Sequence, residues 1–167
     1  MSVYSEHIEH LAANSIDEEF FNSNELHAEI VLTSMIRHAK QKVKIFSGNM
    51  CSDVSNNPNY LNEIKSFLFD RKGTLEILFC DGKDRFKETE IYRILNQFIP
   101  DQVQIKTTKT LLLFEDKPIH FTVADDTAFR LETDIEKRMA RGNFHDPDSG
   151  QMLSKRFDSL FQTGLPL

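Results

Sequence analysis

Apolar residues recur with two different periods near the start of the chain, and these periods predict a helix followed directly by a strand. From Asn24 to Lys40 the apolar positions are spaced by threes and fours, as on one face of a helix. Asn24 can cap that helix, because an asparagine side chain accepts hydrogen bonds from the first free backbone amides. From Lys42 to Gly48 polar and apolar residues alternate, which is the period of a strand.

The same order of helix and strand repeats up to about residue 106. Asn57 and Pro58 form a typical helix start, and Pro100 marks a helix end. The expected elements are helices over 58–71 and 91–98 and strands over 74–80 and 103–105. Because strands that alternate with helices imply right-handed crossovers, we expect this part of the sheet to be parallel.

The second part of the chain has a different pattern, in which turn residues separate short strand-like runs. Strands are expected over 110–114, 119–124 and 128–131. Asp146 and Pro147 start a last helix, and the charged segment 133–145 is expected to be an irregular loop. The whole pattern predicts an α/β domain with a mixed, largely parallel sheet flanked by helices.

Length and composition are those of one domain. The chain has 167 residues, of which 40% are hydrophobic, enough to form a core. Residues 1–23 show no clear period and are expected to form an N-terminal arm, with the domain over 24–167. No apolar run is long enough to cross a bilayer, and the two cysteines lie in unlike contexts. We therefore expect a cytoplasmic protein without membrane contact.

The charge of the chain limits the ways in which it could bind nucleic acid. The formal net charge is −6, which argues against a protein whose whole surface adheres to DNA. Two segments, 37–44 and 137–156, are locally rich in lysine and arginine. Each is either a basic binding patch or an ordinary solvated face.

Several short segments follow one another in an order that a known family shares. Ala39-Lys40 ends a helix before a strand. Residues 67–73 then lead through Gly73 into a strand over 75–79, and Asp81-Gly82 follows it. Over about residues 26–162 this order resembles one half of the phospholipase D superfamily, and the resemblance implies a phospholipase D-like single domain.

The catalytic motif of that family is His-x-Lys, then four residues and Asp, with the histidine as nucleophile toward phosphorus. When Asp125 is aligned with the motif aspartate, Pro118 occupies the nucleophile position and His120 the lysine position. When His120 is aligned as the nucleophile, Thr122 and Thr127 occupy the other two positions. Neither register restores the motif, so the resemblance implies a degenerate site.

The resemblance also suggests a further residue at the site. The family has a Gly-Ser-x-Asn element that contacts phosphate, and Gly142-Asn143 is its nearest counterpart here. Asn143 is therefore a candidate ligand-binding residue, and an ordinary loop Gly-Asn before a helix is the alternative.

Polar side chains on the neighbouring strands form the other candidates. His120 lies on one strand, and Arg130 and Glu132 project from one face of the next, since they are two residues apart. Asp125 and Asp126, at the turn between the strands, are candidate ligand-binding residues. Arginine beside a carboxylate can bind phosphate or form a structural ion pair, and an imidazole can act as a base or bind phosphate. The sequence has no recognised metal-ligand spacing, so neither a metal nor a cofactor is expected.

Three functions remain open. The first is a catalytically degenerate phospholipase D-like domain that binds a phosphate-containing ligand, nucleic acid or a protein partner and is not an enzyme. The second is a divergent phosphodiesterase or nuclease that uses His120 with Arg130 and Glu132. The third is a purely structural subunit of a larger complex. Single-motif members of the family work as homodimers, so the resemblance also implies a homodimer.

Overall fold

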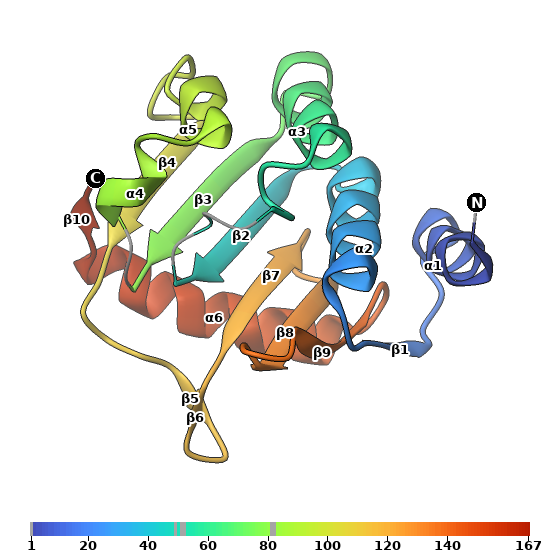
Figure 1. The fold of residues 1–167 in the computed structure, drawn as a ribbon. Coiled ribbons are helices and arrows are strands. Elements are labelled where there is room, and N and C mark those ends of the chain that lie inside the picture. Colours follow the sequence, from blue (N-terminus) through green and yellow to red (C-terminus); the bar gives the residue numbers. More distant parts are fainter. Residues whose placement is uncertain (1, 49, 51–52, 81–82) are drawn as a thin grey trace.

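The computed structural model describes residues 2–48, 50, 53–80 and 83–167. Its centre is an eight-stranded sheet, and a separate two-stranded hairpin projects from it (Figure 1). The helices are α1 (Val3–Ala13), α2 (Glu25–His38), α3 (Pro58–Lys65), the π-helix η1 (Ser66–Asp70), α4 (Lys83–Phe86), α5 (Glu90–Leu95) and α6 (Pro147–Thr163). The strands are β1 (Glu19–Asn22), β2 (Lys42–Ser47), β3 (Thr74–Phe79), β4 (Val103–Thr107), β5 (Leu113–Phe114), β6 (Lys117–Pro118), β7 (His120–Ala124), β8 (Ala128–Asp134), β9 (Met139–Asn143) and β10 (Leu165–Pro166).

The main sheet has the strand order β1-β9-β8-β7-β2-β3-β4-β10. β2, β3 and β4 are parallel, and every other neighbouring pair of this sheet is antiparallel. The expected α/β class with a mixed sheet flanked by helices is confirmed, but parallel pairs do not predominate. The reason is that parallel pairs need crossover connections, whereas β7, β8 and β9 follow one another through tight turns.

The sheet is covered by helices on both faces, so the molecule has two apolar clusters. Residues of β2, β3 and β7 alternate between them. Val43 and Ile45 face α2 and α3, whereas Phe46 and Phe121 face α6. Phe157 of α6 is fully buried in the second cluster. This alternation is the strand period that the sequence predicted, and it directs the even-numbered side chains of β7 and β8 toward α2 and α3.

The first 23 residues join the same core. Ile8 and Leu11 of α1 are 0% and 1% exposed, and they pack with residues of α2. β1 pairs with β9 at one edge of the sheet, where the Tyr4 hydroxyl donates a hydrogen bond of 2.8 Å to the carbonyl of Phe21. The segment therefore supplies a helix and a strand. The domain boundary expected at Asn24 stays a prediction.

Two local expectations from the sequence are wrong. The segment expected as an irregular loop contains the end of β8 and all of β9. The strand expected over 110–114 is shorter than predicted. It consists of β5 alone, which pairs with β6 in the hairpin. Asp81 and Gly82, which contributed to the family resemblance, lie outside the described residues.

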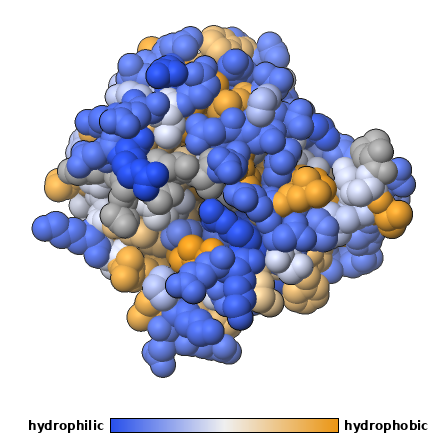
Figure 2. All heavy atoms as spheres, in the orientation of Figure 1, coloured by the Kyte–Doolittle hydropathy of each residue, from blue (hydrophilic) through white to orange (hydrophobic). Residues whose placement is uncertain are grey.

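The surface in the orientation of Figure 2 is mainly hydrophilic, with separate hydrophobic patches. Three exposed apolar side chains, Leu111, Leu113 and Phe114, lie in or next to the projecting hairpin. Among the described residues, no helix has the length and apolar character needed to span a membrane.

Candidate functional site

A pocket of about 160 Å³ lies beside the carboxyl end of β2, on the side of the sheet covered by α2 and α3. Its apolar wall includes Ile45, Met50 and Tyr60, and its polar wall comes from β7, β8 and the turn after β8. Among the described residues, the polar lining residues are Ser47, Ser55, Tyr60, His120, Thr122, Arg130, Glu132 and Arg138. The pocket is partly open to solvent, and both polar and apolar residues line it.

Strand pairing brings three of the predicted site residues together. His120 on β7 is directly opposite Glu132 on β8, and Thr122 is opposite Arg130. Because alternate residues of a strand share a face, His120, Arg130 and Glu132 all lie on the pocket side. The sequence could predict this, since it depends only on the strand period and a tight turn.

Glu132 is the centre of a charged cluster. One of its oxygens, Oε1, lies 3.2 Å from a terminal nitrogen of Arg130 and 3.8 Å from one of Arg138. The other oxygen, Oε2, lies 3.4 Å from Nδ1 of His120. The side chains of Arg130 and Glu132 are almost fully buried, whereas those of Arg138 and His120 are 34% and 18% exposed.

Burial and charge act in opposite directions on these groups. Burial alone would raise the pKa of Glu132, but hydrogen bonds from His120 and Arg130 and their charges lower it below its usual value. Burial also lowers the pKa of Arg130, and Glu132 partly offsets this effect. Arginine remains protonated at neutral pH, so Glu132 and Arg130 form a buried ion pair.

The geometry gives the two ring nitrogens of His120 different roles. An ionised Glu132 carboxylate can only accept hydrogen bonds, so this contact favours a proton on Nδ1 of His120. Nε2 then remains for a ligand. A side chain at Gly48 would approach the ring, because a Cβ there would lie 3.1 Å from Nε2 of His120. A glycine at this position therefore leaves room beside that nitrogen.

Asp125 and Asp126 lie at the opposite end of β7 from this pocket. The Asp125 carboxylate accepts hydrogen bonds of 2.7, 2.8 and 3.0 Å from the backbone amides of Lys40, Gln41 and Lys42. Asp126 accepts a hydrogen bond of 2.5 Å from the hydroxyl of Ser154 on α6. The structure thus does not bring these two carboxylates together with His120, Arg130 and Glu132.

Asn143 also lies outside the pocket. Its amide donates to Asp17 at 2.8 Å and its oxygen accepts from the backbone amide of His145 at 2.8 Å, so both of its polar atoms connect segments of the fold. Pro118 is exposed on β6 and does not line the pocket.

Two residues that the sequence did not single out complete the cluster. Arg138 belongs to the basic segment 137–156, a possible binding patch, and it lies in the turn between β8 and β9. Asn22 is 3% exposed, and its side chain accepts from Nε of Arg130 at 2.8 Å. A single asparagine on an edge strand gives no sequence signal, because its role depends on which strands become neighbours.

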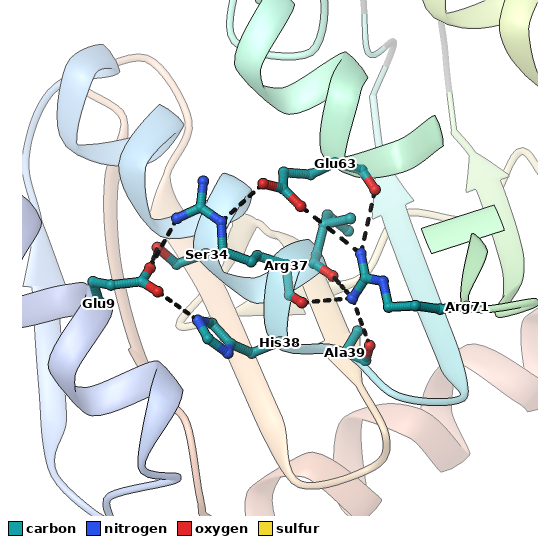
Figure 3. Close-up of polar contacts among 8 residues, drawn as sticks. Glu9, Ser34, Arg37, His38, Ala39, Glu63 and Arg71 are labelled. Carbon is teal, nitrogen blue, oxygen red and sulfur yellow. Dashed lines mark hydrogen bonds and ion pairs between the residues drawn. The ribbon is translucent and has the colours of Figure 1, made fainter. Parts of the chain in front are cut away.

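A second charged network fixes α1 and α3 to α2 (Figure 3). Glu9 lies 2.7 Å from Nε2 of His38 and 3.0 Å from the guanidinium of Arg37, which also contacts Glu63 at 2.8 Å. These contacts join helices and do not line the pocket around His120. Among the described residues, no group of three or more histidine, cysteine, aspartate or glutamate side chains is placed to hold a metal ion.

Comparison with known proteins identifies the fold. No protein-family model matches the sequence, and no similar curated protein is found. The structure resembles TrmBL2, an archaeal chromatin protein described as having a novel mode of DNA binding, with a TM-score of 0.64 and 12% identity. The match covers 97% of this chain and 60% of TrmBL2, so this chain corresponds to only part of that protein.

Two further solved structures match over most of both chains. NucT from Helicobacter pylori has a TM-score of 0.67 and 12% identity, over 91% of this chain and 100% of NucT. Nuc from Salmonella typhimurium, a phospholipase D family member, has a TM-score of 0.58 and 11% identity, over 90% of this chain and 99% of Nuc. Identities this low indicate a shared fold and do not transfer an activity.

Proposed function

Because the chain has a phospholipase D-like fold, we propose that it binds a phosphate-containing ligand in the pocket around His120 and does not cleave it. The observation that carries this proposal is the charge balance of the pocket. Arg130 and Arg138 contribute two positive charges and Glu132 one negative charge, so the cluster is cationic even when His120 is neutral. A phosphate oxygen can accept a hydrogen bond from Arg138, and one from Nε2 of His120 when the imidazole is protonated.

The size of the pocket suits a single phosphate group with a small apolar attachment. Its volume is about 160 Å³, several times the roughly 10–15 Å³ of the same measure that one water molecule needs. Apolar side chains that line it can contact the attached group, while the arginine and histidine contact the anion. A terminal phosphate of a nucleic acid is one source of such an anion, and the described DNA binding of TrmBL2 favours testing it.

The absence of cleavage is proposed from the motif positions. The family mechanism needs a histidine nucleophile and a lysine beside it. Here the register anchored on Asp125 has Pro118 and His120 at these positions. A proline cannot attack phosphorus, so binding without turnover is the function that these residues support.

Titration calorimetry with inorganic phosphate, a mononucleotide and a short single-stranded oligonucleotide tests the proposal. His120→Ala and Arg138→Ala should each weaken binding by about tenfold or more, since hydrogen bonds to charged groups contribute about 1.5–3 kcal/mol. Arg141→Ala is the control, because Arg141 pairs with Glu19 at 3.0 Å and does not line the pocket. Absence of binding by all three ligands at millimolar concentration would contradict the proposal.

The contact between His120 and Glu132 favours one alternative, a divergent phosphodiesterase or nuclease. A carboxylate that holds a proton on Nδ1 leaves Nε2 as a nucleophile or base, with Arg130 nearby as a cation. This alternative predicts hydrolysis of bis(p-nitrophenyl) phosphate or DNA that His120→Ala abolishes. Lack of turnover in the unmodified protein, with and without a divalent metal, would exclude it and support pure binding.

Two further features of the protein are part of the proposal. We propose that it forms a homodimer, as single-motif members of the resembled family do, and light scattering at micromolar concentration tests this. A strict monomer would remove the dimer and leave the binding proposal in place. A cytoplasmic location also stays a prediction, and a fluorescent fusion can test it.

A further inference from the structure

The buried side chain of Asn22 connects the N-terminal segment to the pocket. Asn22 is on edge strand β1, 108 residues before Arg130 in the sequence. Its Oδ1 accepts a hydrogen bond of 2.8 Å from Nε of Arg130, and its Nδ2 donates one of 2.5 Å to the backbone carbonyl of Arg138. The two ends of one amide thus contact the two arginines of the cluster.

The chemistry of the partners fixes the orientation of this amide. An arginine side chain only donates, so the Asn22 oxygen must face Arg130. A backbone carbonyl only accepts, so the Asn22 nitrogen must face Arg138. A reversed amide would oppose donor to donor and acceptor to acceptor, and therefore only one orientation satisfies both contacts.

A continuous chain of contacts leads from Asn22 to the imidazole. The Arg130 guanidinium uses Nε for Asn22 and a terminal nitrogen for Glu132. Glu132 uses its second oxygen for His120. Without Asn22, Nε of Arg130 would lose its acceptor. The guanidinium would then be free to turn both Nε and its terminal nitrogen toward Glu132. The Glu132 carboxylate would then be drawn away from Nδ1 of His120.

The same amide also controls the rim of the pocket. Arg138 has a positive φ of 54° in the turn before β9, so its backbone conformation needs support from its surroundings. The hydrogen bond from Asn22 to its carbonyl supplies such support. Its side chain reaches to 3.8 Å from Glu132 and lines the pocket.

We infer that Asn22 is a positioning residue of the pocket, which sets His120 through Arg130 and Glu132 and sets Arg138 through its backbone. The part of the inference that concerns ligand affinity rests on the proposed function. The part that concerns the state of the His120 ring does not. The N-terminal segment thereby contributes to the site and not only to the core.

Two variants separate the two contacts of Asn22. Asn22→Ala removes both contacts. Asn22→Asp keeps an acceptor for Arg130 but presents a second acceptor to the carbonyl of Arg138, so it should disturb the rim more than the imidazole. Glu19→Ala is the matched control, since Glu19 lies on the same strand and pairs with Arg141.

Nitrogen-15 NMR of the histidine rings reports the protonation of His120 directly. Asn22→Ala should change the ring nitrogen-15 shifts and the tautomer balance of His120 in the same direction as Glu132→Gln does. Asn22→Asp should change them less, and Glu19→Ala should leave them unchanged. If Asn22 had only a structural role, its replacement would lower stability without changing the His120 signals. His120 signals in Asn22→Ala that equal those of the unmodified protein would overturn the inference.

Calorimetry with inorganic phosphate gives the second measurement. Both Asn22 variants should bind phosphate several-fold more weakly, with Glu19→Ala within twofold of the unmodified protein. If His120→Ala weakens binding but neither Asn22 variant does, the inference fails and the proposed function stands. If the unmodified protein binds no phosphate, the proposed function fails and the NMR result still decides the inference. Should Asn22→Ala fail to fold, Asn22→Leu replaces it in both measurements, since it also removes both contacts and nearly keeps the side-chain volume.

Discussion

Asp125 supports the turn into β2 with a single carboxylate. It accepts hydrogen bonds from the amides of Lys40, Gln41 and Lys42, while its own backbone has a positive φ of 53°. Hydrogen bonds to a charged group contribute about 1.5–3 kcal/mol each and are not additive, so Asp125→Ala should lower the free energy of unfolding by about 3 kcal/mol. Urea denaturation measures this loss.

Asp116 provides the control for that substitution. It also has a positive φ, of 62°, in the turn between β5 and β6, and it is exposed. Asp116→Ala introduces the same backbone strain without removing three amide contacts, so its effect should be about 1 kcal/mol. Equal losses for the two variants would show that strain, and not hydrogen bonding, explains the importance of Asp125.

These residues also show what the sequence could predict about the site. The strand period was enough to put His120, Arg130 and Glu132 on one face. It was not enough to separate them from Asp125 and Asp126, because adjacency in a sequence does not say toward which end of a strand a pocket lies. The contacts of Asn22 and Arg138 depend on the pairing of β1 with β9, which no local pattern encodes.

At the level of elements, Arg71 holds the carboxyl end of α2. Its guanidinium donates to the carbonyls of Ile36, Arg37 and Ala39 and also to that of Glu63 (Figure 3). The last carbonyls of a helix have no partner within the helix, and a cation there also opposes the helix dipole. Arg71 thus joins the end of α2 to α3.

Replacing this arginine should destabilise the protein. We expect Arg71→Ala to lower the free energy of unfolding by about 2 kcal/mol, because several partly buried carbonyls lose a charged donor. Arg71→Lys should recover part of this, since an ammonium can satisfy fewer of them. Arg93→Ala is the control, because Arg93 is 68% exposed and pairs only with Glu90 in the described contacts. Thermal or chemical denaturation compares the three variants, and similar values for Arg71→Ala and Arg93→Ala would contradict this role.

The order of elements was predicted better than the shape of the sheet. The hydrophobic period identified α2, β2, α3, β3, β4, β7, β8 and α6. It missed β9 because Gly142 is a poor strand residue by propensity. In the structure, a side chain at Gly142 would come within 2.3 Å of the carbonyl oxygen of Phe129 and 2.5 Å of the Phe20 ring. Close packing, which appears only after the strands pair, explains this glycine.

The stability of the whole molecule should depend on pH in a direction set by two carboxylates. Burial alone would raise the pKa of Glu9 and of Glu132, but hydrogen bonds and positive neighbours lower both below 4.5. A lowered folded-state pKa means that the folded protein binds fewer protons than the unfolded chain. The stabilising contribution of the two ionised carboxylates is therefore complete above about pH 4.5. It is lost as the pH falls through their folded-state pKa values.

Denaturation between pH 7 and pH 3 tests this dependence. The unmodified protein should lose stability below about pH 4.5, and Glu132→Gln should show a smaller loss over the same range because one of the two groups no longer titrates. Glu9→Gln removes the other group at a distant position, so its effect should add to that of Glu132→Gln. Parallel curves for the unmodified protein and both variants would contradict this assignment.

The hydrogen bond from Tyr4 to the carbonyl of Phe21 has a consequence for handling the protein. Phe21 is 64% exposed on a strand at the edge of the sheet. An uncovered edge with an aromatic side chain is a template on which other chains can add as strands. A protease that removes α1 would remove the Tyr4 hydroxyl from the Phe21 carbonyl of this edge, so clipped preparations should precipitate or form fibrils, and intact ones should stay dispersed.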